Sequence, residues 1–570
     1  MDNNLDIEIE RFSEGTCYTA YRLFGVHADG NGALTFRVWA PDAECVHLVG
    51  DFNDWNISAA LMECIREGVY EITLKDIPLY SNYKYAVTRK DGSVYLMADP
   101  YAFHAETNGG SASKVWFEKE PFKWEDEEYL EQRHGRDSEK SPVNIYEVHA
   151  AGWRRCEDGS YYDYEKLSLE LVPYVKDMGY THIEFMPLME YSNEDSLGYE
   201  TTGYFALTSR FGTPEGFMKL VNQAHKAGVG VILDWSAGKE GEFDYLKGQV
   251  RSFILSSAMY LLKECHADGL RIGNLIAFRN EAGDTILKSL SEMVRIHVPD
   301  AIICAAGAGM GQIVTKEPCE GGLGLDYMWN DGWTKDTLSY ISTDLFFRKQ
   351  QHNRLTFPLS HAYSERHLIS VSHKDVGRGL KSLIDKMPGE YEEKFAGLRG
   401  FMMFFMSQPG KKLIFMGSEF GQFDEWDYKR GLEWNLLDYE THKKTLEYVK
   451  DLNYFYLEHP QLWEIDSSWK GFQWINAEDS ENSVISYWRI AFDGSRLMFA
   501  VNFSGSAKER YRIDVPDERV YKEIINSDEE KYGGSGMVNP CDITPVKYQG
   551  SRRGQYIEVN LPPFGAVVLE

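Results

Sequence analysis

Long apolar runs are absent from this 570-residue sequence, and its longest wholly apolar stretch covers only residues 401–406. A helix that crosses a bilayer needs about 20 mostly apolar residues, so we expect no membrane span and no membrane partner. The first residues are acidic and carry no apolar core, so no signal peptide is expected. The eight cysteines are scattered without a CxxC pair, which favours reduced thiols and predicts a cytoplasmic location.

Positive charge is also scarce. The chain has 60 Lys and Arg against 88 Asp and Glu, a net charge of −28, which excludes the cationic surface that a nucleic-acid partner requires. The sequence has no HExxH, no Cys/His cluster and no EF-hand pattern, so we expect neither a metal nor another cofactor. No GxGxxG or P-loop pattern follows any predicted strand, which argues against a doubly wound nucleotide-binding sheet.

Aromatic residues are plentiful, at 14% of the chain. Most rings are expected in hydrophobic cores, but some could form platforms that stack on flat, hydroxyl-rimmed ligands such as sugars. Composition alone leaves both interpretations open. The length predicts about three or four domains, each able to bury its own core.

The first part of the chain has the pattern of a small β-sandwich. Apolar and polar residues alternate in 33–41, 44–52, 68–74 and 82–88, with turn signals between these segments. We therefore predict a β-sandwich over 15–118. The polar and charged stretch 119–140 is predicted to be a linker with some helical character.

From residue 141 onward, short apolar strands alternate with helical segments. This pattern demands a parallel sheet, and eight such strands predict a (β/α)8 TIM barrel over 141–462. The tail, 468–570, returns to β alternation and predicts a second, all-β sandwich. The fold class is thus a multidomain α/β protein with a central barrel between two β-sandwiches. The eight predicted barrel strands are 144–150, 181–187, 228–235, 267–272, 301–306, 323–329, 367–372 and 412–417.

Motifs along nearly the whole chain give it a family likeness. Examples are GDFNDWN (50–56), GYETTGYFALTSRFGTPEGF (198–217), AHKAGVGVILDW (224–235), EGGLGLDYMWNDGW (320–333), PGKKLIFMGSEFGQ (409–422) and NSDEEKYGGSG (526–536). In these segments and in domain order, the chain resembles the glycogen branching enzymes of glycoside hydrolase family 13. Its N-terminal domain looks like a family 48 carbohydrate-binding module.

The resemblance implies a retaining transfer of α-glucan chains by a nucleophilic carboxylate, an acid/base carboxylate and a third carboxylate. None of the three is in its expected motif. The position of the nucleophile holds Gly273, that of the acid/base holds Ala306, and that of the third carboxylate holds Lys374. Lys239 also replaces a sugar-binding histidine, and the neighbouring loops are short.

From these substitutions we expect a catalytically degenerate homologue that is not an enzyme. The leading hypothesis is a non-catalytic protein of glycogen metabolism that binds an α-glucan polymer, a maltooligosaccharide or other enzymes of that metabolism. One alternative is an active branching enzyme or hydrolase with relocated carboxylates, for which Glu240, Glu242, Asp375 and Glu419 are the candidates. The other alternative is a protein-interaction scaffold that no longer binds sugar.

The resemblance also implies two remaining sugar sites. In the barrel, the family's sugar-contacting positions hold Tyr199, Asp234, Arg271 and His373. In the N-terminal module, Trp55, Lys84 and Tyr85 are at positions where some relatives bind maltooligosaccharides. For the cleft we further expect Lys239 and Lys374 to pair with Asp234 and Asp375 as a structural plug. The alternative for all of these residues is a purely structural role.

Overall fold

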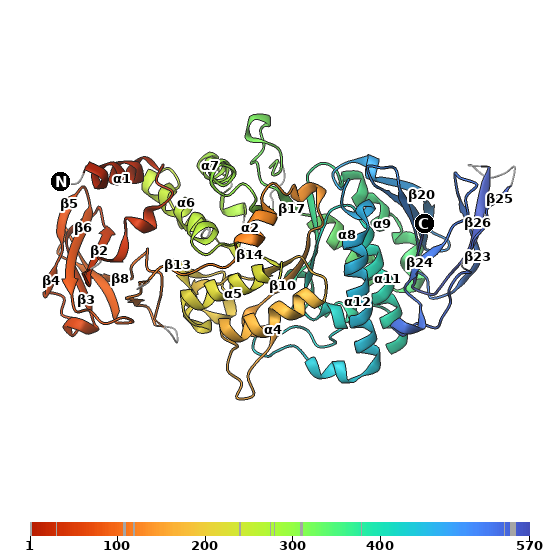
Figure 1. The fold of residues 1–570 in the computed structure, drawn as a ribbon, viewed down its shortest axis with the longest axis horizontal. Coiled ribbons are helices and arrows are strands. Elements are labelled where there is room, and N and C mark those ends of the chain that lie inside the picture. The colour runs from red at the N-terminus through yellow and green to blue at the C-terminus, as the bar shows by residue number, and fades with distance from the viewer. Residues whose placement is uncertain are drawn as a thin grey trace.

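The computed structural model describes most of the chain. The described residues are 3–29, 31–106, 110–117, 120–236, 238, 241–273, 275–278, 280–307, 312–377, 379–540, 542–547 and 554–570. Figure 1 shows three parts in a row, with an N-terminal β domain, a central barrel and C-terminal β-sheets. The predicted fold class is confirmed.

The N-terminal domain is a sandwich of two sheets, ordered β1-β2-β6-β5 and β4-β3-β7-β8. A helix that the sequence did not predict, α1 (Asn3–Glu14), precedes it and packs on a barrel helix, α6 (Gly248–Lys263). The strands are β1 (Gly25–Ala28), β2 (Ala33–Trp39), β3 (Ala43–Gly50), β4 (Ala60–Leu61), β5 (Glu63–Arg66), β6 (Val69–Lys75), β7 (Asn82–Arg89), β8 (Val94–Met97) and β9 (Ser113–Lys114).

The barrel closes through eight parallel strands, and each of them coincides with a predicted strand. They are β10 (Asn144–Val148), β11 (His182–Phe185), β14 (Gly230–Trp235), β15 (Gly269–Ile272), β16 (Ile302–Ala305), β17 (Tyr327–Trp329), β18 (His367–Val371) and β19 (Lys411–Phe415). Between β11 and the next helix, the antiparallel pair β12 (Met189–Tyr191) and β13 (Thr201–Leu207) forms an excursion.

Helices surround the barrel because each has an apolar face to bury against the strands. The helix α5, for example, begins where Thr213 accepts a hydrogen bond from the Gly216 amide and Pro214 occupies the first turn. The helices after α1 are α2 (Glu127–Arg133), α3 (Ala150–Trp153), α4 (Tyr164–Asp177), α5 (Pro214–Lys226), α6, α7 (Glu281–His297), α8 (Asp331–Ile341), α9 (Asn353–Thr356), α10 (His373–Val376), α11 (Tyr391–Ser407) and α12 (Glu440–Glu458).

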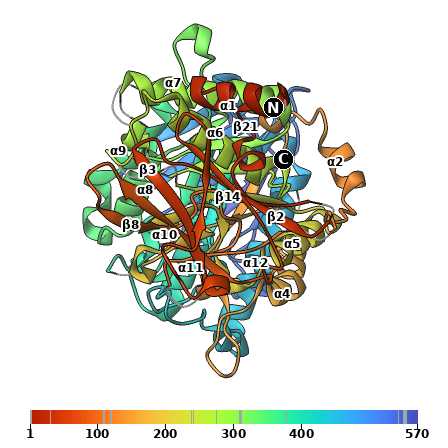
Figure 2. The same ribbon diagram turned by 90° about the vertical axis from the view of Figure 1, so that its left-hand side faces the viewer.

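Alternate residues of the strands fill the barrel's interior. A separate hydrophobic cluster includes Ile145, Ile232, Ile302, Cys304 and Leu413, one or two residues from each of several strands. Because side chains alternate along a strand, the residues two positions further along each strand also face inward. This periodicity places the candidate site at the carboxyl ends of the same strands. Figure 2 looks along the molecule from the N-terminal side.

The segment predicted as a linker is anchored by a buried ion network. Asp126, just before α2, accepts hydrogen bonds from His225 Nδ1 and His266 Nδ1, each at 2.8 Å. The other ring nitrogen of His225 lies 2.8 Å from Asp268, which also accepts from Arg133 of α2 at 2.5 Å. Charged residues in this segment therefore fasten it to the barrel instead of only solvating it.

The C-terminal domain is the predicted second sandwich. Its sheets are ordered β20-β21-β22-β27-β24 and β23-β26-β25. The strands are β20 (Phe472–Asp479), β21 (Val484–Ile490), β22 (Arg496–Asn502), β23 (Lys508–Asp514), β24 (Glu523–Asn526), β25 (Val546–Lys547), β26 (Gln555–Leu561) and β27 (Ala566–Leu569). The exact boundaries of the three domains stay a prediction.

Candidate functional site at the carboxyl end of the barrel

The predicted cleft positions converge at one end of the barrel. Asp234 on β14 is the register partner of Arg271 on β15. Gly273 comes directly after β15, and the Ala306 amide donates to the carbonyl of Ile272 at 3.1 Å. The ends of β15 and β16 therefore lie side by side. Parallel barrels carry their sites at this end, where the strand-end loops meet.

Arg271, Asp234 and Tyr199 form one bonded group. Arg271 is 0% exposed and pairs with Asp234 through Nη1, which also donates to the Tyr199 hydroxyl at 2.9 Å. The Tyr199 hydroxyl itself donates to Asp234. Burial opposes the charge of Arg271, but Asp234 outweighs it and raises the arginine's pKa. Burial also raises the pKa of Tyr199, which stays a neutral donor.

His373 joins this group through a carboxylate that the sequence analysis did not single out, Glu147 of β10. The His373 Nδ1 lies 2.5 Å from Glu147, whose other oxygen accepts the His373 amide at 2.9 Å. The Nε2 then faces the Tyr199 hydroxyl at 3.3 Å. Although burial works against it, His373 and Arg271 hold the pKa of Glu147 below its usual value. In the sequence, only its place in the predicted strand 144–150 pointed to this residue.

Trp329 of β17 also contacts Arg271, in addition to the ion pair of Arg271 with Asp234. The Arg271 guanidinium lies 4.2 Å from the ring centroid of Trp329, and Lys374 Nζ lies 5.5 Å from the same centroid. The two cations are thus held by cation–π contacts. The expected pairing of Lys374 with Asp234 and Asp375 is wrong, because no ion pair within 4 Å joins these described residues. Asp375 instead accepts from Ser372 at the start of α10.

A second buried carboxyl group, Glu184 of β11, lies in the barrel interior. It is 1% exposed, and neither of its oxygens has a hydrogen-bond partner in the described structure. Burial raises its pKa well above the usual range, with Glu147 and Asp234 adding to the effect and Arg271 opposing it. An unpaired buried carboxyl group is stable only in its neutral form. Burial without a partner therefore favours the neutral carboxylic acid form of Glu184.

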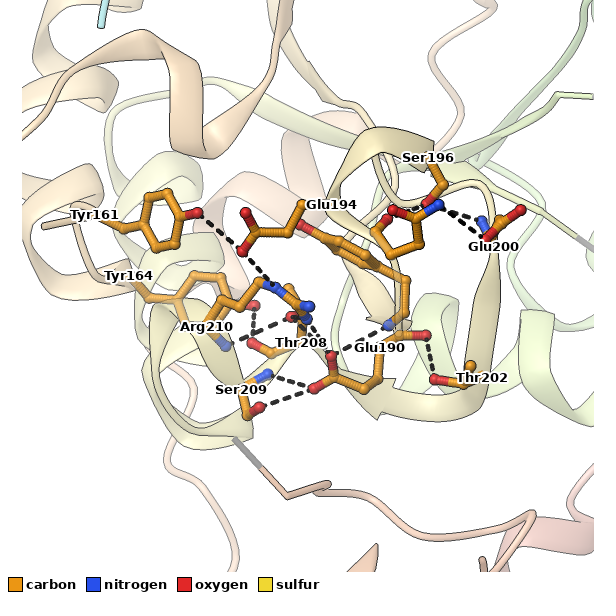
Figure 3. A network of polar contacts seen from close by, with 12 residues as sticks. Tyr161, Tyr164, Glu190, Glu194, Ser196, Glu200, Thr202, Thr208, Ser209 and Arg210 are labelled. Carbon is orange, nitrogen blue, oxygen red and sulfur yellow. Dashed lines mark hydrogen bonds and ion pairs between the residues drawn. The ribbon is translucent and has the colours of Figure 1, made fainter. Parts of the chain in front are cut away.

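The excursion that carries Tyr199 is held at its base by Glu190 of β12. The Glu190 carboxylate accepts from the amide and hydroxyl of Ser209, both at 2.8 Å, and from Arg210 at 2.5 Å (Figure 3). Arg210 also lies 3.6 Å from Glu194, inside the excursion. These contacts fix the loop so that Tyr199 reaches the cleft.

The three positions that lack carboxylates differ in their surroundings. A Cβ added at Gly273 would lie 3.1 Å from Asp234 Oδ1 and 3.5 Å from Arg271 Nη1. Ala306 is fully buried, and Lys374 is exposed.

The described part of the chain contains no group of three or more His, Cys, Asp or Glu arranged to hold a metal ion.

Two candidate relocated carboxylates are engaged elsewhere. Glu419 is buried and accepts from the hydroxyls of Tyr146 and Tyr174 at 2.7 and 2.8 Å. Glu242 accepts from the Tyr204 hydroxyl at 3.1 Å. Lys239 and Glu240 lie outside the described residues.

In the N-terminal module, the predicted binding residues do not all reach the surface. Trp55 is 36% exposed, and its Nε1 donates to Asp51 at 3.0 Å. Lys84 donates to the Ser111 hydroxyl at 2.6 Å. Tyr85 is fully buried and its hydroxyl donates to Asp99, so the prediction that its ring contacts a glucan is wrong. The alternation of β7 turns Tyr85 into the sandwich core.

Three protein families match separate parts of the chain. Residues 23–102 match carbohydrate-binding module 48 (isoamylase N-terminal domain). Residues 169–263 match the alpha amylase catalytic domain, and residues 474–570 match the alpha amylase C-terminal all-beta domain. No helix in the described part of the chain has both the length and the apolar character needed to cross a membrane.

Curated relatives match the chain from end to end. The 1,4-alpha-glucan branching enzyme GlgB of Desulfitobacterium hafniense is 39% identical over 99% of this chain and 97% of its own length. The GlgB of Halothermothrix orenii is 39% identical over 100% and 99%. The expectation that the chain is not an enzyme is contradicted by this finding, because these full-length relatives are named as enzymes.

Solved structures share the fold at low identity. The catalytic module of the glycogen-degrading pneumococcal virulence factor SpuA superposes with a TM-score of 0.74 at 17% identity, covering 99% of this chain and 98% of its own. A pullulanase from Anoxybacillus complexed with maltotetraose gives 0.74 at 16%, covering 98% and 89%. At this identity the likeness supports the fold alone.

Proposed function

The chain belongs to the 1,4-alpha-glucan branching enzyme family, and we propose that it binds an α-1,4-glucan at the carboxyl end of its barrel. The observation that carries the proposal is the bonded group of Tyr199, Asp234, Arg271 and His373 at that end. Four side chains from four separated segments meet there with their polar atoms in contact. Such convergence of polar groups beside an aromatic ring suits a polyhydroxylated ligand.

Each member of the group has a part in binding. Tyr199 is half-buried, so one region of its ring remains open to stack on a pyranose. Asp234 Oδ1 has no hydrogen-bond partner among the described residues, but it is buried, so a sugar hydroxyl reaches it only when a neighbouring side chain moves. Arg271 and Glu147 do not need to touch sugar, since they hold Asp234 and His373 in place. The group is thus preorganised before a ligand arrives.

Chain transfer is a separate question from binding. A retaining transfer needs two carboxyl groups about 5–5.5 Å apart, and positions 273, 306 and 374 supply none. Any transfer by this chain must therefore use carboxyl groups elsewhere. Besides Asp234, the described barrel strands offer Glu147, a carboxylate held by His373, and Glu184, whose neutral form is favoured by burial.

The N-terminal module supports glucan binding of a second kind. Its match to carbohydrate-binding module 48 and the partly exposed Trp55 favour a surface contact with polymer chains.

Two further predictions concern the protein's surroundings: that it binds other enzymes of glycogen metabolism, and that it is located in the cytoplasm. The scattered cysteines support the location.

The test compares Tyr199→Phe with wild type. Removing one hydroxyl takes away the contacts to Asp234, Arg271 and His373, and we expect the affinity for maltotetraose by calorimetry to fall about tenfold, the loss of roughly one polar interaction. Tyr454→Phe is the matched control, since the described contacts of this α12 hydroxyl are two 3.4 Å hydrogen bonds to the carbonyls of Lys176 and Asp177 in α4. Unchanged affinity in Tyr199→Phe would refute the cleft as the binding site.

A branching assay on amylose, followed by iodine staining, uses the same preparations. Branch formation by wild type would assign the transfer to carboxyl groups outside positions 273, 306 and 374. Glu184→Gln then tests one of them directly, because glutamine keeps the shape of the side chain and removes its proton-donating acid.

A further inference from the structure

A pocket of about 450 Å³ lies at the junction of α11 and the C-terminal domain, and its lining includes none of the cleft residues. It is formed by one face of α11, by the loop after β24 and by the turn between β26 and β27. The lining includes Glu392, Glu393, Ala396, Arg399, Asp528, Gly533, Gly534 and Phe564. The volume falls within the range of about 300–1,000 Å³ that is usual for small-molecule sites.

Arg399 is the central polar group of this pocket. It is 3% exposed, and its Nε donates to the carbonyl of Ser527 at 2.8 Å. This is the only hydrogen bond that the described structure gives the guanidinium, although a guanidinium carries five N–H donors. A Cβ added at Gly533 would lie 3.9 Å from Arg399 Nη1, so the glycine leaves open the space beside these donors.

The remaining lining groups define the ligand's chemistry. Glu392 and Glu393 in the first turn of α11, and Asp528 opposite, outnumber the single arginine. Three acidic groups against one cation disfavour a phosphate or carboxylate ligand. A neutral polyol can accept from the Arg399 N–H groups and donate to Glu392. The Asp528 carboxylate already accepts from Ser535 and Met537, and the Glu393 carboxylate accepts from the Glu390 amide. Phe564 adds an apolar side chain to the lining, but it is only 5% exposed and offers little ring surface for stacking.

We propose that this pocket is a second binding site, which takes a glucose residue of an α-glucan independently of the barrel cleft. The identity of the ligand rests on the proposed function, whereas the unpartnered donors and the open pocket do not. A polymer with many glucose residues can then engage the cleft and this pocket on one chain. Two such contacts raise the effective affinity for a polymer above that for a short oligosaccharide.

The variants fill the pocket or alter its central donor. Ala396 is half-buried on the pocket face of α11, and Ala396→Met places a long side chain into the space while keeping the helix. Arg399→Lys keeps the charge but removes the planar fork of donors. Lys443→Met, an exposed position on the neighbouring α12, introduces the same new side chain outside the pocket. Thermal melts confirm that each variant is folded.

The measurement is calorimetric titration of the full chain with maltotetraose. We expect wild type and Lys443→Met to show two sites that a Trp55→Ala change leaves in place, and Ala396→Met and Arg399→Lys to weaken one of these two at least tenfold. Tyr199→Phe should weaken the other. A single site in wild type that Tyr199→Phe abolishes overturns the pocket proposal and leaves the cleft intact. A single site that Ala396→Met abolishes supports the pocket and overturns the cleft. Competition by inorganic phosphate at the pocket would also overturn the proposal, because it would show an anion site.

Discussion

Replacing His225 by glutamine perturbs the ion network that fastens the segment before and within α2 to the barrel. His225 is completely buried, and both of its ring nitrogens lie 2.8 Å from aspartate oxygens, one of Asp126 and one of Asp268. A neutral imidazole has one donor and one acceptor, so bonding to two carboxylates requires the doubly protonated ring. We therefore expect His225 to be charged in the folded protein at neutral pH.

The magnitude follows from the pKa of His225. Burial favours the neutral ring, but Asp268 and Asp126 outweigh it and raise the pKa from 6.5 to about 9. This difference corresponds to about 3 kcal/mol of stability, at roughly 1.4 kcal/mol for each tenfold change in proton affinity. For a chain of this length that unfolds as one unit, a loss of about 3 kcal/mol lowers Tm by about 2–3 °C.

The sign of the pH dependence is set by the raised pKa. The contribution of His225 is complete below the unfolded value of 6.5 and is lost as the pH rises through about 9. Despite burial, His225 and its neighbours hold the pKa values of Asp126 and Asp268 far below normal. Their contribution is present above about pH 4 and lost at more acidic pH. The network is strongest between these limits.

The assay is calorimetric unfolding of wild type and His225→Gln at pH 6 and pH 9.5. At pH 6 we expect the variant to melt lower, and at pH 9.5 the difference should shrink markedly. His361→Gln, at an exposed histidine, is the control and should match wild type at both pH values. An equal difference in Tm at both pH values would refute a charged His225, since a pH-independent loss means that only shape or neutral hydrogen bonds were removed.

Two further predictions concern the barrel interior and the N-terminal module. Burial raises the pKa of Glu184 well above normal, so this side chain destabilises the folded protein at any pH above its pKa in the unfolded chain. Glu184→Gln should therefore raise Tm at pH 8 but not at pH 4. Glu419→Gln, which disturbs hydrogen bonds from Tyr146 and Tyr174, should instead lower Tm at pH 8, and a fall in both variants would contradict the neutral state of Glu184. Trp55→Ala should weaken the retardation of the protein in glycogen-containing gels several-fold. The control is Trp469→Ala, at another exposed ring in a different domain, and it should migrate like wild type. Equal retardation of wild type and Trp55→Ala would exclude a glucan contact at Trp55.

The sequence by itself determined the barrel and the order of the domains. Each of the eight strands coincides with a predicted apolar segment, because a strand buried on both faces must be apolar along its whole length. It also placed Asp234, Arg271 and His373 at one end of the barrel, since all three are near the ends of parallel strands. The local pattern of apolar residues is enough to predict a strand where any shift of that strand's register would expose its apolar side chains.

Only the tertiary structure decided which side chains meet. Glu147 and Glu184 sit inside ordinary strand patterns, and their importance comes from register with strands far along the chain. Tyr85 could have faced either side of its sheet, and the second sheet of the sandwich decided that it is buried. The sequence predicts the stretch 119–140 to be a linker with some helical character, yet His225 and Asp268 bind Asp126 and Arg133 of this stretch and attach it to the barrel. Long-range contacts of this kind depend on closure of the barrel, which no local sequence pattern reports.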